Sequence, residues 1–279
     1  MEIVADDKKL HLVQSLMFEM LCDIDDFCKK HNIRYLLSGG TCLGAVRHNG
    51  FIPWDDDSDI MMPRKDYMKF FKLFGKYYAD KYGASCCEMD REWIRPSGRI
   101  WNKATSVIYK NVEDREMGVF VDIFPIDGLP DGKLSRKIFY RKLMVLEVLR
   151  SSSIRKAFIK NEKYRTLKHF IGFFAKHLNP RGLALRMNLI GRKYDFDTCK
   201  LVGASMAGVH WDQETIVREG MASAAYLPFN GRKFPVPLYY DTYLSNLYGD
   251  YMTLPDEEHR ETHCQLYELK YDPEKIHLD

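Results

Sequence analysis

Four aspartates stand within the five residues 55–59, and the apolar run Ile60-Met61-Met62 follows them directly. The apolar run predicts a buried strand. Residues two apart on a strand point to the same face, so we expect Asp57 and Asp59 to present two carboxylates side by side. Asp55 joins them if the strand extends back that far. Carboxylates at this separation repel unless a cation lies between them, so the segment predicts a cation site.

A third acid stands alone in a second apolar strand. Asp122 is the one polar residue of the run 119–124. A lone carboxylate in such a strand is unfavourable unless it is paired or bound to a metal. Hard oxygen ligands suit Mg²⁺ or Mn²⁺. We therefore expect Asp57, Asp59 and Asp122 to bind a divalent cation, and either Asp122 or Asp55 to take the proton of an incoming hydroxyl.

Two glycines precede the acid segment. A short apolar run, 35–38, leads into Gly39-Gly40, and a helix-length segment, 41–48, follows. Without Cβ atoms the backbone can approach a phosphate, and the N–H groups at a helix start favour an anion. We expect Gly39, Gly40 and Thr41 to contact the substrate. A Gly-Gly pair alone is usually only a turn, but the order of strand, glycines, helix, acid strand and third acid predicts a centre for phosphoryl-type transfer.

Cationic and aromatic residues lie beside these motifs in the sequence. A diphosphate donor needs cations, and the candidates are Arg47, His48, Arg64 and Arg99. For each of them a solvated surface position is the alternative. Trp54 directly precedes the acids and could stack on a base or face a quaternary ammonium group, the alternative being a core tryptophan.

Periodicity places the acids in an α+β fold, a mixed sheet flanked by helices with a basic helical insertion. We expect residues 1–132 to form the core with the catalytic acids, 133–199 the insertion and 200–279 the remainder of the core. Predicted helices cover 6–30, 41–48, 64–79, much of 133–193, 239–247 and 256–264, and predicted strands cover 35–38, 57–62, 99–101, 106–109, 119–124, 201–208 and 225–229. Pro125 and Gly128 are expected to end the strand that holds the third acid.

Charge is unevenly distributed along the chain. The formal net charge is only +3, yet residues 133–193 contain 17 Lys and Arg against two Glu. This block is a solvated helical face, a nucleic-acid patch, or a surface that docks on anionic lipid and a lipid-linked or polymeric glycan acceptor. We expect the last of these, a peripheral membrane contact, and no nucleic acid, because no binding module accompanies the charge.

The cellular location follows from two further features. No stretch approaches the ~20 apolar residues of a membrane span, and the N-terminus lacks the apolar segment of a secretory signal. We therefore expect a cytoplasmic protein, located at the inner face of the membrane if the basic block docks there.

Three blocks resemble the LicD family, to which fukutin and fukutin-related protein also belong. They are the run 37–60, continuing through 62–67, the run 120–130, and the segment 243–255. The resemblance implies a nucleotidyltransferase-like fold and transfer of a phosphorylated alcohol from a CDP-activated donor, with release of CMP. In bacterial members this looks like transfer of phosphocholine from CDP-choline to sugars of teichoic acid or lipopolysaccharide, and a capsule glycan is a similar acceptor.

The resemblance also assigns roles to residues. It implies that Asp57 and Asp59 are metal ligands, Asp122 the third acid and Asp55 a supporting acid, and Arg47 and Arg99 lie in motif positions. Two alternatives stay open. One is a nucleotidyltransferase that acts on a nucleoside triphosphate, and the other is a non-catalytic glycan-binding protein.

Overall fold

The computed structural model describes residues 1–110, 115–156, 173–208, 210–257, 260, 262 and 267–276, and it has a mixed α+β architecture. The central sheet has the strand order β2-β3-β7-β5-β4. β3 and β7 are parallel, and the other pairs on this path are antiparallel. The strands are β2 (Leu36–Leu37), β3 (Asp59–Pro63), β4 (Tyr82–Ser85), β5 (Gly98–Asn102) and β7 (Phe120–Gly128), and β8 (Leu201–Gly203) pairs with β7 and with β9 (Ile216–Val217).

Two smaller sheets accompany the central one. β10 (Ala224–Phe229) and β11 (Arg232–Pro237) form an antiparallel hairpin. β12 (Tyr267–Tyr271) lies between β1 (Glu2–Ile3) and β6 (Thr105–Tyr109). Segments near both ends of the chain therefore share one sheet. Tyr267 also donates a hydrogen bond from its hydroxyl to Asp56 Oδ2 over 3.1 Å, so this sheet reaches the acid segment.

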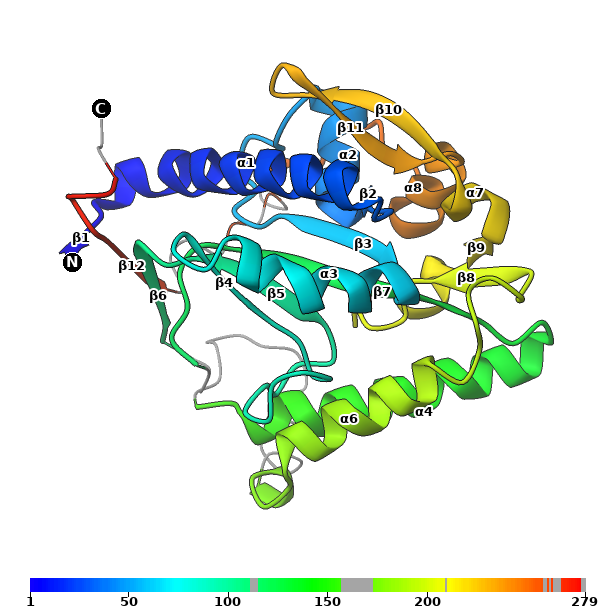
Figure 1. Ribbon diagram of the computed structural model, residues 1–279. Coiled ribbons are helices and arrows are strands. Elements are labelled where there is room, and N and C mark those ends of the chain that lie inside the picture. The colour runs from blue at the N-terminus through cyan, green and yellow to red at the C-terminus, as the bar shows by residue number, and fades with distance from the viewer. Residues whose placement is uncertain are drawn as a thin grey trace.

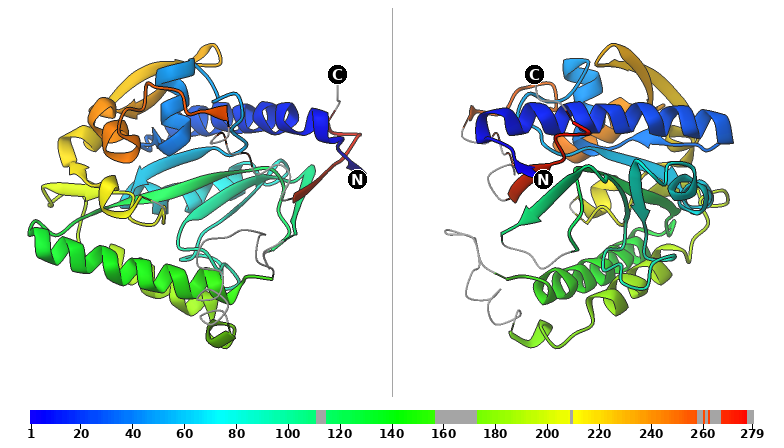
Figure 2. Two further views of the ribbon diagram at one scale, coloured as in Figure 1. Left: turned by 180° about the vertical axis from the view of Figure 1, so that it is seen from behind. Right: turned by 60° about the vertical axis from the view of Figure 1, so that its left-hand side comes forward.

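The helices cover the central sheet from both sides. Figure 1 shows α1 above the sheet, together with α2, α8 and the β10–β11 hairpin, and α4 and α6 side by side below it; the views in Figure 2 agree. The helices are α1 (Asp6–His31), α2 (Gly39–His48), α3 (Arg64–Tyr77), α4 (Lys133–Ser153), α6 (Pro180–Gly191), α7 (Arg218–Ala222) and α8 (Tyr240–Tyr248). In the described residues, no helix has the length and apolar character needed to cross a bilayer.

Amphipathic periodicity accounts for the main core. The apolar positions of α1 that recur at three- and four-residue steps are buried from Val13 onward, as predicted, and Phe27 among them packs edge-on against Phe70 and Phe74 of α3. α3 likewise buries the one face that its sequence pattern indicates. The helical prediction is confirmed by α4 and α6 for the described parts of the basic block, and the facing side chains of these helices form a second apolar cluster. Residues 157–172 of the block lie outside the described residues. The helix expected over 256–264 lies mostly outside the described residues.

The structure corrects three boundaries. The glycine pair forms the start of α2, which begins at Gly39, instead of a turn before the helix. β3 begins only at Asp59, so Asp57 precedes the strand. β7 continues through Pro125 to Gly128 where the sequence predicted a break. Strands β1, β4, β9, β11 and β12 were not predicted.

The place of Pro125 in β7 explains the last correction. The Asp122 N–H donates to Ser58 O on the β3 side, so alternation places the nitrogen of Pro125 on the opposite side of the strand. On that side the pairing with β5 ends at Ile123 and the pairing with β8 begins at Asp127. No strand requires a donor in the gap between them, so a proline is tolerated there.

Candidate active site

A row of three charged residues crosses the central sheet. Asp59 of β3 is directly opposite Asp122 of β7 in the parallel pair, and Asp122 is opposite Arg99 of β5. Residues opposite each other in register lie on the same face of a sheet. Arg99 donates from Nε to Asp122 Oδ1 over 2.6 Å and from Nη2 to Oδ2 over 2.8 Å, and its guanidinium lies 3.6 Å from the centre of the Phe120 ring. The structure thus brings the two predicted acids together and adds an arginine to them.

The carboxylates ahead of β3 belong to the same cluster. Burial, followed by the charges of Asp57, Asp122 and Asp55, raises the pKa of Asp59 well above its ordinary value, and Arg99 opposes this. Burial and the neighbouring Asp57 raise the pKa of Asp55 to about 8. Four carboxylates therefore share a space that has too little positive charge for all of them to ionise.

The start of α2 is joined to β3 by two hydrogen bonds, one between backbone groups and one to a side chain. Ser38 N–H donates to Asp59 O over 3.0 Å, and Asp59 N–H donates to Thr41 Oγ1 over 2.8 Å. Gly39 adopts φ +48°, which favours glycine. A Cβ on Gly39 would lie 3.5 Å from Asp59 Oδ2, and one on Gly40 would lie 3.0 Å from Asp55 Oδ2. The glycines therefore lie directly against the acids, as expected, while Thr41 positions β3.

Residues that sequence reasoning missed support the start of α2. The Tyr243 hydroxyl accepts from Gly39 N–H over 3.3 Å, shares a 3.1 Å hydrogen bond with Ser38 Oγ, and donates to Glu214 Oε2 over 3.3 Å. Burial raises the pKa of Glu214 to about 8. Tyr248 lies close to the acid cluster as well, since burial and then the charge of Asp59 raise the pKa of its hydroxyl. Both tyrosines lie in the third block of the resemblance, which could have signalled them, but no sequence pattern marks Glu214.

The side chains of Arg47, His48 and Trp54, which were expected to contact the substrate, make contacts with other residues of the chain. Arg47 Nη1 donates to the backbone oxygens of residues 251 and 253 over 2.7 and 3.4 Å, which ties α2 to the segment after α8. The rings of His48 and Trp54 meet edge-on with centroids 6.4 Å apart. The Arg260 guanidinium lies 4.8 Å from the centre of the Trp54 ring. The Trp54 ring, which was expected to face a base or a quaternary ammonium group, thus faces the Arg260 guanidinium.

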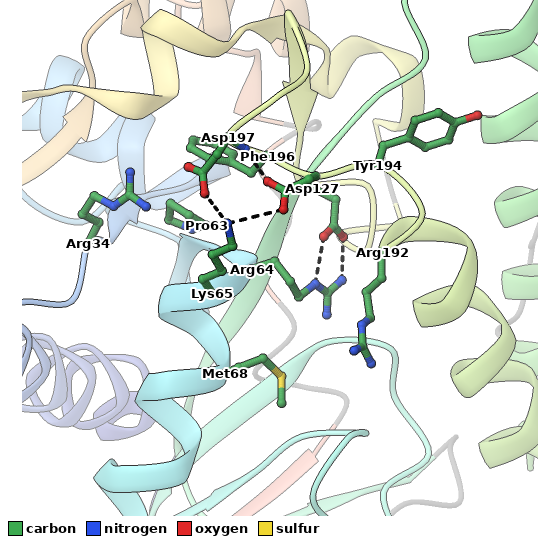
Figure 3. Close-up of a pocket in the computed structure, with 11 residues that line it drawn as sticks. Arg34, Pro63, Arg64, Lys65, Met68, Asp127, Arg192, Tyr194, Phe196 and Asp197 are labelled. Carbon is green, nitrogen blue, oxygen red and sulfur yellow. Dashed lines mark hydrogen bonds and ion pairs between the residues drawn. The ribbon is translucent and has the colours of Figure 1, made fainter.

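Arg64 lies at the other end of β3 and is not brought to the acids. It follows the last residue of β3, whereas Asp59 opens the strand, which separates them by roughly 16 Å at strand spacing. Its guanidinium donates to Asp127 over 2.8 and 2.5 Å, to Glu88 over 2.8 Å and to Asn188 over 2.9 Å. Figure 3 shows the Arg64–Asp127 pair in a pocket of about 410 Å³. These contacts give Arg64 a structural position, in contrast to the expected substrate contact.

The donor chemistry of the acid cluster fits a hard divalent cation. Carboxylate oxygens are the ligands that Mg²⁺ and Mn²⁺ prefer. Neighbouring carboxylates repel the ionised form of Asp59, and a cation would offset this repulsion. Within the described parts of the chain, no three His, Cys, Asp or Glu side chains are arranged so that they could hold a metal ion. Both oxygens of Asp122 are bound by Arg99 in this arrangement.

Comparison with known proteins places this cluster in a family context. Residues 32–170 match the family described as "LicD/FKTN/FKRP, nucleotidyltransferase domain". The chain is 30% identical over 243 residues to the lipopolysaccharide cholinephosphotransferase LicD of Haemophilus influenzae, an alignment that covers 85% of this chain and 88% of that protein. Shorter matches of 61 residues link it to uncharacterized proteins of Rickettsia typhi, at 38% identity, and Rickettsia prowazekii, at 44% identity. These cover 22% of this chain and 20% and 23% of the two rickettsial proteins.

Proposed function

Because this chain belongs to the LicD/FKTN/FKRP family, we propose that it transfers phosphocholine from CDP-choline to a sugar hydroxyl of a cell-surface glycan, with release of CMP. The acceptor class is lipopolysaccharide, teichoic acid or capsule. The observation that carries the proposal is the pairing of Asp59 and Asp122 on adjacent parallel strands, directly against the Gly39-Gly40 start of α2. This arrangement also supports a nucleotidyltransferase-like core for the sheet.

The donor's diphosphate is best accommodated beside the acids, next to the start of α2. Mg²⁺ is usually bound by one or two carboxylates together with substrate phosphates, so two of Asp57, Asp59 and Asp122 would suffice to hold Mg²⁺ or Mn²⁺, which would supply the positive charge that the diphosphate and the crowded carboxylates require. The first N–H groups of a helix have no intrahelical partner and favour an anion. Arg99 binds both oxygens of Asp122 with its guanidinium and so places a positive charge beside the proposed diphosphate site.

Of the two candidates for the general base, Asp55 is favoured over Asp122. Arg99 binds both oxygens of Asp122, which weakens that carboxylate as a proton acceptor. Asp55 is held at a pKa of about 8, close to the value that suits proton transfer at neutral pH. In the proposed step Asp55 takes the proton of the sugar hydroxyl. The hydroxyl oxygen forms a bond to the choline-bearing phosphorus, and the bond from that phosphorus to the CMP oxygen breaks.

Product analysis tests the proposal. The protein is incubated with CDP-choline, Mg²⁺ and lipopolysaccharide that lacks phosphocholine, and both CMP and choline-labelled glycan are quantified. We expect Asp57→Asn and Asp59→Asn to lower CMP release roughly a hundred- to a thousandfold, because each removes a carboxylate that would hold the cation at the donor site. Asp131→Asn is the control, since Asp131 is an exposed carboxylate that precedes α4. Full turnover by either of the two variants would sink the assignment of the acids.

A second arm separates donor classes. Specific donors stabilise the folded chain by mass action, so thermal unfolding is followed with CDP-choline, CDP-ribitol, CDP-glycerol and CTP, each with and without Mg²⁺. We expect stabilisation by CDP-choline that EDTA reverses. Release of pyrophosphate from CTP would instead identify a nucleotidyltransferase, and EDTA-insensitive glycan binding without turnover of any donor would identify a binding protein.

We also propose that the enzyme acts in the cytoplasm at the inner face of the membrane, where it would meet a lipid-linked acceptor. The support is the cationic character of residues 133–193.

A further inference from the structure

α4 has apolar side chains on two different faces. One face packs inward, where Phe139 and Leu143 are buried against Met187 of α6. The opposite face is exposed, although its apolar residues recur with helical periodicity. They are Leu134 at 72% exposure, Ile138 at 45%, Val145 at 59% and Val148 at 42%. A helix that is apolar on an unburied face indicates an interaction surface.

The exposed face is hollowed between α4 and α6, a feature that we call the α4–α6 groove. The groove has a volume of about 660 Å³. Its apolar lining includes Leu189, which is 67% exposed at the end of α6. Cations from both helices surround the apolar residues. The lining combines Ile138, Val145 and Leu189 with Arg141, Lys142 and Arg186.

The charge around the groove has one sign. Glu147 is the one carboxylate in the sequences of α4 and α6, against eight Lys and Arg. It is bonded to Arg150 on the same helix over 2.7 and 2.5 Å, so it does not compensate the groove cations. The partner of this surface must therefore be anionic and must offer an apolar layer as well.

We propose that the α4–α6 groove docks the chain on a bilayer that contains anionic phospholipid. The apolar side chains enter the boundary between headgroups and acyl chains, and the groove cations lie at the level of the lipid phosphates. A nucleic acid would match the charge but leave Val145 and Leu189 in water. A second copy of the chain would bring the same positive charge to the interface. The proposal concerns where the enzyme is held and does not depend on its donor.

Vesicle sedimentation of the full chain tests the proposal. We expect strong binding to vesicles of phosphatidylcholine mixed with phosphatidylglycerol and little binding to phosphatidylcholine alone. The triple variant Arg141→Gln/Lys142→Gln/Arg186→Gln should bind the anionic vesicles roughly a hundredfold more weakly. The double variant Val145→Ser/Leu189→Ser should bind them roughly tenfold more weakly, because it loses insertion while keeping the charge.

Matched variants elsewhere on the surface serve as controls. Lys72→Gln/Lys76→Gln/Lys233→Gln removes three exposed lysines, and Val217→Ser/Leu238→Ser removes two exposed apolar side chains; all should bind vesicles like the unaltered chain. Thermal unfolding confirms that every variant is folded. Equal binding to neutral and anionic vesicles would overturn the proposal. The proposal would also be overturned if Val145→Ser/Leu189→Ser bound anionic vesicles as strongly as the unaltered chain and RNA competed with the vesicles. A dimer in sedimentation velocity that depends on the groove residues would overturn it as well.

Discussion

The contacts of Arg64 predict a variant that separates stability from activity. Arg64→Met keeps an unbranched stem of similar reach but removes the guanidinium that bridges Asp127, Glu88 and Asn188. The carboxylates left behind are 1% and 7% exposed, so they would lose their main partner while largely shielded from water. Breaking a buried pair in this way costs about 3–5 kcal/mol.

This magnitude converts into an observable shift. At about 2 cal/mol/K of unfolding entropy per residue, a chain of this length loses roughly 1.7 °C of Tm per kcal/mol, so Arg64→Met should melt ~5–8 °C lower. Urea unfolding should show a lower midpoint with an unchanged slope. Because Arg64 lies at the far end of β3 from Asp59, CMP release per folded molecule, measured well below the melting range, should stay within about twofold of the unaltered chain.

A matched variant gives this prediction its contrast. Arg99→Met also breaks a bidentate pair in which the arginine is 7% exposed, but that pair lies within the acid row. It should lose stability to a similar extent and should lose CMP release as well. The reasoning is refuted if Arg64→Met abolishes CMP release while its Tm is unchanged, since Arg64 would then act on the donor.

Two further predictions concern the glycines at the start of α2 and the buried Glu214 that supports them. Gly40→Ala places a Cβ 3.0 Å from Asp55 Oδ2 without a backbone penalty, so it should lower turnover roughly tenfold at unchanged stability. Gly39→Ala is strained by φ +48° and should lower the free energy of unfolding by about 1–2 kcal/mol in urea unfolding. Equal behaviour of the two variants would contradict this geometry. Folded Glu214 holds its proton up to a pKa of about 8 instead of its ordinary 4.5, so the native state binds more protons between these values and stability falls as pH rises through them. Glu214→Gln should remove the contribution of Glu214 to this loss of stability, which is ~1.4 kcal/mol per pH unit at most, as measured by urea unfolding at pH 5 and pH 8. An unaltered dependence of stability on pH would show that Glu214 is ionised in the folded chain.

Local sequence pattern predicted those parts of the site that depend on local structure. The periodicity of α1 and α3 and the isolation of Asp122 in an apolar strand are visible in a single segment. The acid strand and the glycine pair were also expected, each displaced by one or two residues. These features follow from which residues are apolar and in what order, which the chain states directly.

Features that depend on contacts between distant segments could not be predicted. The pairing of Asp59 with Asp122 is a matter of strand register, and the fork from Arg99 requires that β5 be the next strand. Arg64 stands beside the acids in the sequence, but the length of β3 carries it to the opposite end of the sheet. Glu214 gave no signal, because a lone acid becomes significant only once the fold buries it.

The hydrogen bond from Tyr267 to Asp56 spans 211 residues of the chain and has a consequence for biosynthesis. A ribosome delivers the acid segment early but Tyr267 late, after the basic helices have already emerged. The loop that holds the carboxylates therefore lacks this support throughout most of translation. Folding of the acid segment would therefore be completed only once Tyr267 has been synthesised.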